Sequence, residues 1–166
     1  PVKNGNICSK NEICQIALIE RHQATGVVTN AFVTGFGYQG EMAVASTVAH
    51  DSHHMIVVGT CRKNMALASN RLAEVGGGVT VWKDGSELAL VELPIAGLMS
   101  DAPALMVAAK ADRMTEAIKE CGCSLNNAFM QHSLLALVVI PEIRISDLGL
   151  IDVTKFEITN LVKGSE

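Results

Sequence analysis

Residues 50–54 hold the densest set of side chains that could do chemistry. They read His50-Asp51-Ser52-His53-His54 and include three of the five histidines of the chain. Imidazole nitrogens bind metals or transfer protons near neutral pH, and a neighbouring carboxylate can orient a histidine or bind a metal itself. Three interpretations stay open for this segment: a metal site, a hydrogen-bonded cluster that positions a ligand, and an exposed turn.

Two apolar segments flank this cluster. Residues 43–49 and 55–60 are rich in valine, alanine and isoleucine, a composition typical of buried strands. Buried polar groups are costly unless they are paired, so the cluster must either be exposed at a turn or serve a chemical role. The sequence therefore predicts two strands with a polar segment at their shared edge.

Strand geometry would limit what the cluster can do by itself. Successive side chains along a strand point to opposite faces of the sheet. His50 and His53 would then face apart, so a metal site would need a turn or a ligand from elsewhere. Ser52 and His53 would also face apart, which argues against a nucleophile and its base. The isolated His22 and His132 are interpreted as structural histidines.

A second unusual segment, residues 34–40, contains three glycines among its seven residues. Gly35 and Gly37 indicate backbone that needs positive φ or a close approach to another group. Their spacing does not match the dinucleotide-binding fingerprint, and no helix pattern follows. A flexible hairpin loop and a loop that contacts a ligand both stay open.

The remaining periodicities predict a mixture of helices and strands. Apolar residues recur at helical spacing through 65–75 and 107–121, and glycines follow both segments. We expect Ser100 or Asp101 to cap the second helix, with Pro103 in its first turn. Strands are expected in the following segments: 13–19, 25–33, 79–82, 87–93, 143–145 and 151–153.

Turn signals and ambiguous segments complete the predicted architecture. Residues 4–6 indicate a tight turn, and residues 84–85, Asp-Gly, indicate a hairpin. Residues 125–140 fit neither the helical nor the strand period, and residues 156–162 are a last strand or a tail. The sequence therefore predicts one α+β domain over residues 1–166, with a mixed, largely antiparallel sheet and two or three packed helices.

Composition argues against several classes of protein. A formal charge of −4 without a lysine or arginine cluster argues against a nucleic-acid partner. No apolar run approaches the roughly 20 residues of a membrane helix, and no signal peptide is expected. Five irregularly spaced cysteines predict reduced thiols in a cytoplasmic protein. Cys121 and Cys123 alone are too few for a structural zinc site.

Residues 45–60, Ala-Ser-Thr-Val-Ala-His-Asp-Ser-His-His-Met-Ile-Val-Val-Gly-Thr, resemble the C-terminal domain of bacterial and archaeal adenine deaminases of the amidohydrolase superfamily. At one position, His54, the resemblance implies asparagine. Further segments resemble this family in the same order along nearly the whole chain: residues 20–22, 25–26, 35–37, 65–68, 70–72, 76–78, 83–85, 93–101 and 152–157.

The resemblance implies a parent enzyme that hydrolyses adenine to hypoxanthine and ammonia in purine salvage. In that family a (β/α)8 barrel holds manganese, iron or zinc, which activates water for attack at C6 of the purine. This chain lacks the barrel's ligand motifs, so we expect no metal site in it and no deamination by it alone. The implied partners are the barrel domain of the same polypeptide, adenine, and further copies in a homo-oligomer.

The resemblance also implies a role for residues 50–54 at the mouth of the barrel, where they would help to complete or cover the purine site. The candidate catalytic residues are His50, Asp51 and His53, and the candidate substrate-binding residues are Ser52, His54, Gly35 and Gly37. Two other roles stay open: a module that joins subunits through apolar surface, and a domain that senses a purine.

Overall fold

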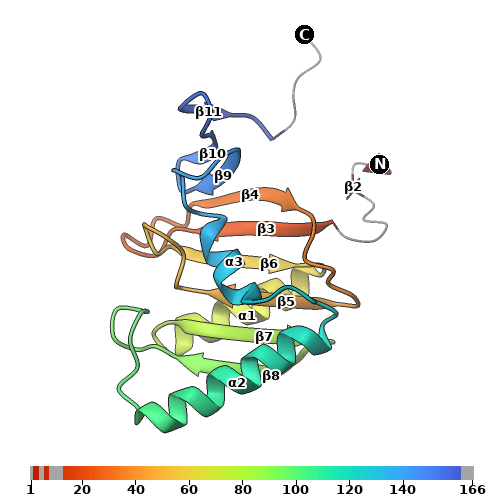
Figure 1. Ribbon diagram of the computed structural model, residues 1–166. Coiled ribbons are helices and arrows are strands. Elements are labelled where there is room, and N and C mark those ends of the chain that lie inside the picture. Colours follow the sequence, from red (N-terminus) through yellow and green to blue (C-terminus); the bar gives the residue numbers. More distant parts are fainter. Residues whose placement is uncertain (1, 4–5, 8–12, 162–166) are drawn as a thin grey trace.

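The computed structural model describes residues 2–3, 6–7 and 13–161 of the chain (Figure 1). Near the N-terminus, β1 (Val2–Lys3) pairs antiparallel with β2 (Asn6–Ile7). The tight turn predicted at residues 4–6 includes two positions that lie outside the described residues. The described part of the chain forms three helices and antiparallel sheets of two, three and six strands, which confirms the predicted α+β fold class.

A six-stranded antiparallel sheet forms the body of the molecule. Its strands lie side by side in the order β4 (Val28–Val33), β3 (Cys14–Ile19), β6 (Met55–Gly59), β5 (Met42–Ser46), β7 (Gly78–Lys83) and β8 (Ser86–Glu92). The two strands predicted around residues 50–54 are therefore the central pair, β5 and β6. Every residue of both strands is buried, because helices cover both faces of the sheet.

The alternation along β5 and β6 divides the core into two layers. Ala43, Ala45 and Val57 pack with Leu72 of α1 (Arg62–Glu74) on one face. Residues of the alternate positions, such as Val58, face the larger core below α2 (Ala104–Glu120) and α3 (Ala128–Leu134). Figure 1 shows α2 and α3 in front of the sheet and α1 behind it. The sheet is thus held rigidly from both sides.

The start of α2 differs from the prediction. Pro103 has φ −55° and ψ 139° and occupies the N-cap position, so it lies before the first turn and not within it. Its carbonyl accepts the first hydrogen bonds of the helix, from Met106 and Val107. The Ser100 hydroxyl lies too early in the chain to cap the helix and instead accepts a hydrogen bond from Ala102 N–H at 3.3 Å. The predicted cap at Ser100 or Asp101 is therefore wrong.

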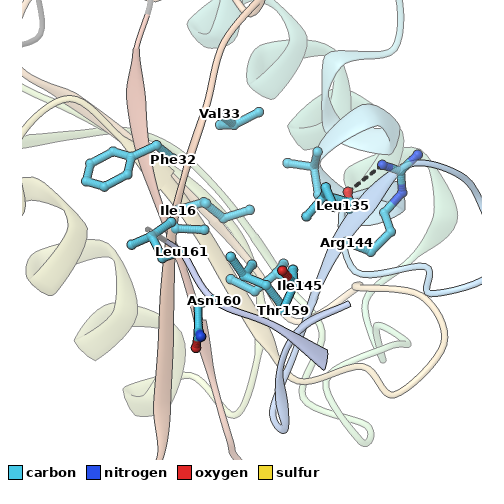
Figure 2. Close-up of a pocket in the computed structure, with 12 residues that line it drawn as sticks. Ile16, Phe32, Val33, Leu135, Arg144, Ile145, Thr159, Asn160 and Leu161 are labelled. Carbon is cyan, nitrogen blue, oxygen red and sulfur yellow. Dashed lines mark hydrogen bonds between the residues drawn. The ribbon is translucent and has the colours of Figure 1, made fainter. Parts of the chain in front are cut away.

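A small antiparallel sheet of β9 (Ile143–Ser146), β10 (Gly149–Asp152) and β11 (Glu157–Thr159) packs beside β4. It confirms the strands predicted at 143–145 and 151–153. A cavity of about 370 Å³ lies between this sheet and the main one. Figure 2 shows Ile16 and Leu161 on one side of this cavity and Leu135 and Arg144 on the other.

The cysteines of the described residues are free thiols: Cys14, Cys61, Cys121 and Cys123. Cys8 lies outside these residues. Burial raises the pKa of the Cys14 and Cys121 thiols to about 11, so both stay protonated and poorly nucleophilic near neutral pH. Of the helices that the structure describes, none combines the length and apolar character needed to cross a bilayer.

Candidate functional site

Residues 50–54 form the connection between β5 and β6. In Figure 1 this connection lies at the left end of the sheet, together with the β3–β4 turn and the segment between β8 and α2. His53 N–H donates to the Ala49 carbonyl at 2.7 Å, so the chain makes a turn here and the strand does not continue. The rings of His50 and His53 have their centroids 5.1 Å apart. The prediction that His50 and His53 face apart is therefore wrong.

The polar side chains of this turn differ in exposure and in hydrogen bonding. The Asp51 side chain is 81% exposed, and its Oδ1 lies 3.8 Å from Nδ1 of the partly exposed His50. His53 has a left-handed backbone with φ 54°, a region in which histidine is less rare than most residues. Its Nδ1 accepts a hydrogen bond from Ala49 N–H at 3.2 Å. The neutral ring must then carry its hydrogen on Nε2.

The surroundings of His53 favour this neutral ring. Burial lowers the pKa of His53 from its ordinary value, and the nearby His50 and Arg21 side chains lower it further. The Asp51 carboxylate acts in the opposite direction and is the weaker influence. His53 is therefore kept neutral near pH 7, with Nε2–H available as a hydrogen-bond donor.

Arg21 ties this turn to the segment between β8 and α2. Its Nε donates to the His53 carbonyl at 2.6 Å, and its Nη2 donates to the Ala96 carbonyl at 2.8 Å. The guanidinium lies directly against Gly97, where an added Cβ would come within 2.9 Å of Nη2. Arg21 thus fixes the position of His53 through two backbone contacts made by different nitrogens of one planar guanidinium.

Thr47 also connects these segments, through hydrogen bonds of its hydroxyl group. Its buried hydroxyl donates to the Gly97 carbonyl at 2.6 Å and accepts a hydrogen bond from Gly78 N–H at 2.8 Å. The end of β5, the start of β7 and the segment beyond β8 therefore form one rigid support under the turn.

His54 points away from the turn into a neighbouring polar pocket of about 340 Å³. The His54 side chain is only 7% exposed. Its Nδ1 accepts a hydrogen bond from Arg21 N–H at 3.4 Å, and its Nε2 lies 3.7 Å from Oδ1 of Asp147. The pocket is lined by Glu20, His22, Gln23, Thr25, Val27, His54, Asp147 and Leu148. His54 belongs to this pocket and is separated from His50 and His53.

Glu20 organises the β3–β4 turn that forms one wall of the pocket. Its carboxylate accepts hydrogen bonds from the backbone N–H groups of His22, Gln23 and Thr25 and from the Thr25 hydroxyl. These donors, the backbone groups of Thr25 and Gln23 first among them, lower the pKa of Glu20 to about 2. The carboxylate is therefore ionised throughout the neutral range and already has its full set of partners.

The two histidines interpreted as structural have different settings. His132 is 1% exposed, forms a hydrogen bond with the Tyr38 hydroxyl at 2.9 Å, and has its pKa lowered to about 3 by burial. Its burial and its contact with Tyr38 agree with the structural role predicted for His132, but its buried Nδ1 has no hydrogen-bond partner among the described residues. His22 is exposed, and because a carbonyl can only accept, its Nε2 donates to the Ser52 carbonyl at 2.6 Å. Its ring centroid lies 4.6 Å from that of His54, so His22 is also part of the pocket wall.

The structure does not bring Gly35 and Gly37 to this end of the molecule. They follow β4 and lie at the end of the sheet opposite to residues 50–54, as Figure 1 shows. An added Cβ at Gly122 would lie 2.8 Å from the Gly37 carbonyl. Gly37 therefore makes a close approach to the C-terminal end of α2, whereas Gly35 has φ +94° and open space around it. Their assignment as substrate contacts stays a prediction that this placement does not support.

The described residues contain no group of three or more His, Cys, Asp or Glu side chains that could hold a metal ion. The arrangement at residues 50–53 is suited instead to hydrogen bonding and proton transfer, with a neutral imidazole beside an exposed carboxylate. Sequence reasoning missed Arg21 and Asp147, which lie far from residues 50–54 along the chain. The resemblance in residues 20–22 was the one signal that could have indicated Arg21.

Comparison of the sequence with known proteins places this chain in a family of enzyme domains. The family model described as adenine deaminase C-terminal domain matches residues 1–157. Adenine deaminases from Ruegeria pomeroyi and Paracoccus denitrificans are 72% and 65% identical, each over 98% of this chain. An adenine deaminase from Moorella thermoacetica is 45% identical over 99% of the chain.

The chain belongs to the adenine deaminase C-terminal domain family. It spans 28%, 27% and 28% of the lengths of these three relatives, in the same order. More than two thirds of each relative therefore lies outside the region of similarity.

Proposed function

We propose that this domain is the C-terminal part of an adenine deaminase. The whole enzyme converts adenine and water into hypoxanthine and ammonia, in purine salvage in the cytoplasm. In this proposal residues 50–53 help to complete or cover the active site of a barrel domain in the same polypeptide. The observation that carries it is the geometry of the turn. A neutral His53 and an exposed Asp51 are presented at one end of the sheet by backbone contacts from Arg21.

The chemistry expected of this turn is positioning of the purine. The Nε2–H of neutral His53 would donate a hydrogen bond to a ring nitrogen, and the Asp51 carboxylate would accept one from an N–H group. His50, beside Asp51, would orient that carboxylate. A manganese, iron or zinc ion held by the barrel would supply the activated water. This chain alone would release no ammonia from adenine.

Hydrogen exchange in the full-length enzyme tests the proposed contact. An inert substrate analogue should slow backbone exchange in residues 50–53, whereas the loop at residues 35–37, at the other end of the sheet, should be unaffected. Equal protection of both loops, or no protection of residues 50–53, would contradict the proposal.

A second candidate function is a module that joins subunits, and one observation favours it. Five large apolar side chains between β8 and the first turn of α2 are exposed: Ile95, Leu98, Met99, Leu105 and Met106. Exposed apolar surface of this kind commonly marks a protein interface. Sedimentation of the full-length enzyme with Leu105→Asp separates the two roles, because loss of the oligomer would support assembly.

A further inference from the structure

His54 and Asp147 face each other across the polar pocket without using their full hydrogen-bonding capacity. Because His54 Nδ1 accepts the Arg21 N–H, the neutral ring carries its hydrogen on Nε2. The 3.7 Å between Nε2 and Oδ1 of Asp147 exceeds the roughly 2.7–3.2 Å of an N–H···O hydrogen bond. Within the described residues neither atom has a hydrogen-bond partner. His54 Nε2 is not among the fully buried polar atoms that lack a partner, so both groups stay open to a ligand that enters the pocket from solvent and meets them side by side.

The two groups offer a donor beside an acceptor. Such a pair is complementary to a planar ligand that carries an acceptor next to an N–H donor, such as the edge of a nitrogen heterocycle. The remaining walls suit a flat ring: the centroids of the His22 and His54 rings lie 4.6 Å apart, and the exposed Val27 and Leu148 add apolar surface at the rim. A volume of about 340 Å³ is at the small end of the roughly 300–1,000 Å³ of ligand pockets, and fits a single bicyclic base.

The charge of the pocket selects against anions. Glu20 lies 3.9 Å from Nδ1 of His54 and is ionised, although its oxygens are already occupied by the turn. Asp147 adds a second carboxylate. The Arg21 guanidinium is directed away from the pocket, toward the His53 and Ala96 carbonyls. A phosphorylated ligand would therefore be repelled, and a neutral base would be accepted.

We propose that this pocket binds a free purine base. His54 Nε2–H donates to a ring nitrogen or carbonyl oxygen of the base, and Asp147 accepts a hydrogen bond from the neighbouring N–H or amino group. Adenine and hypoxanthine both carry such a pair. The choice of purines among nitrogen heterocycles rests on the proposed function, and the pocket then senses the substrate or product of the enzyme.

Calorimetry of the 166-residue chain with adenine and with hypoxanthine tests this assignment. We expect saturable binding of one base per chain, weakened at least tenfold by Asp147→Ala. The matched control is Asp101→Ala, which removes an exposed carboxylate from the segment before α2 and should leave binding unchanged. Binding without loss in Asp147→Ala, or no heat of binding for either base at millimolar concentration, would overturn the proposal.

A second variant and a second probe complete the test. His54→Phe keeps a planar ring but removes the Nε2–H, and should also weaken binding tenfold while circular dichroism shows an intact fold. If His54→Phe unfolds the chain, an NMR titration of the wild-type chain with adenine replaces it. Adenine should shift the Nε2–H resonance of His54, and an unshifted resonance would overturn the proposal. Binding of Mn²⁺ that depends on Asp147 would contradict a base site. These outcomes are separate from the proposed function, which concerns residues 50–53 of the full-length enzyme.

Discussion

Arg21 is the residue on which the position of His53 depends. Arg21→Ala removes two hydrogen bonds that a charged group donates, one to the partly buried His53 carbonyl and one to the exposed Ala96 carbonyl. We expect a loss of about 2 kcal/mol in the free energy of unfolding, measured by urea denaturation. Arg62→Ala removes an exposed arginine on α1 and should change stability by less than about 0.5 kcal/mol. Equal effects of the two substitutions would show that Arg21 does not hold the turn.

A second prediction concerns His132, whose pKa of about 3 lies below the 6.5 of an ordinary histidine. Between these two pH values the unfolded chain binds a proton at His132 and the folded chain does not. The free energy of unfolding therefore falls as the pH falls below 6.5. The loss from His132 should be about 2 kcal/mol between pH 6.5 and pH 5.

His132→Phe isolates this dependence. Glu20 has its pKa depressed to about 2, so its stabilising contribution is lost only below about pH 4.5 and leaves this window undisturbed. The slope of unfolding free energy against pH should be smaller in His132→Phe than in the wild-type chain. Identical slopes would mean that His132 is accessible to protons in the folded state.

For the individual helices and strands, the local sequence pattern was sufficient to predict the core elements but not the turns and helix caps. The valine-rich segments around residues 50–54 became β5 and β6, and helical spacing through 65–75 became α1. The cap of α2 could not be predicted because Ser100 bonds locally to Ala102. The orientation of His53 could not be predicted either, since it is set by Arg21, 32 positions away.

Gly97 provides the prediction for the segment between β8 and α2. It has φ +74° and lies against the Arg21 guanidinium, with an added Cβ 2.9–3.0 Å from three of its atoms. Gly26 has nearly the same φ, +77°, but open space around it. Gly26→Ala should cost about 1 kcal/mol from backbone strain alone. Gly97→Ala should cost more, because Arg21 must also move.

The comparison of the two alanine variants by urea denaturation isolates the contact between Gly97 and Arg21. In the double variant with Arg21→Ala, Gly97→Ala should cost no more than Gly26→Ala does. A cost for Gly97→Ala that is unchanged by Arg21→Ala would contradict the contact.

For the whole molecule, the sequence indicated the α+β class and the family but not the arrangement of the site. The pocket of His54 is completed by Asp147, which comes from the β9–β10 turn of the small sheet. Such contacts between distant segments leave no periodic or local signal. The structure thus separates the cluster at residues 50–54 into two parts, a turn with His50, Asp51 and His53 and a pocket with His54.

The central claim is that this turn contributes to deamination of adenine in the full-length enzyme. His53→Ala removes the Nε2–H donor while leaving the backbone contact with Arg21 in place. We predict that kcat/KM for adenine falls at least tenfold, whereas Lys63→Ala, on the exposed side of α1, leaves it unchanged. Unchanged kcat and KM in His53→Ala, with the metal content of the wild-type enzyme, would contradict the claim.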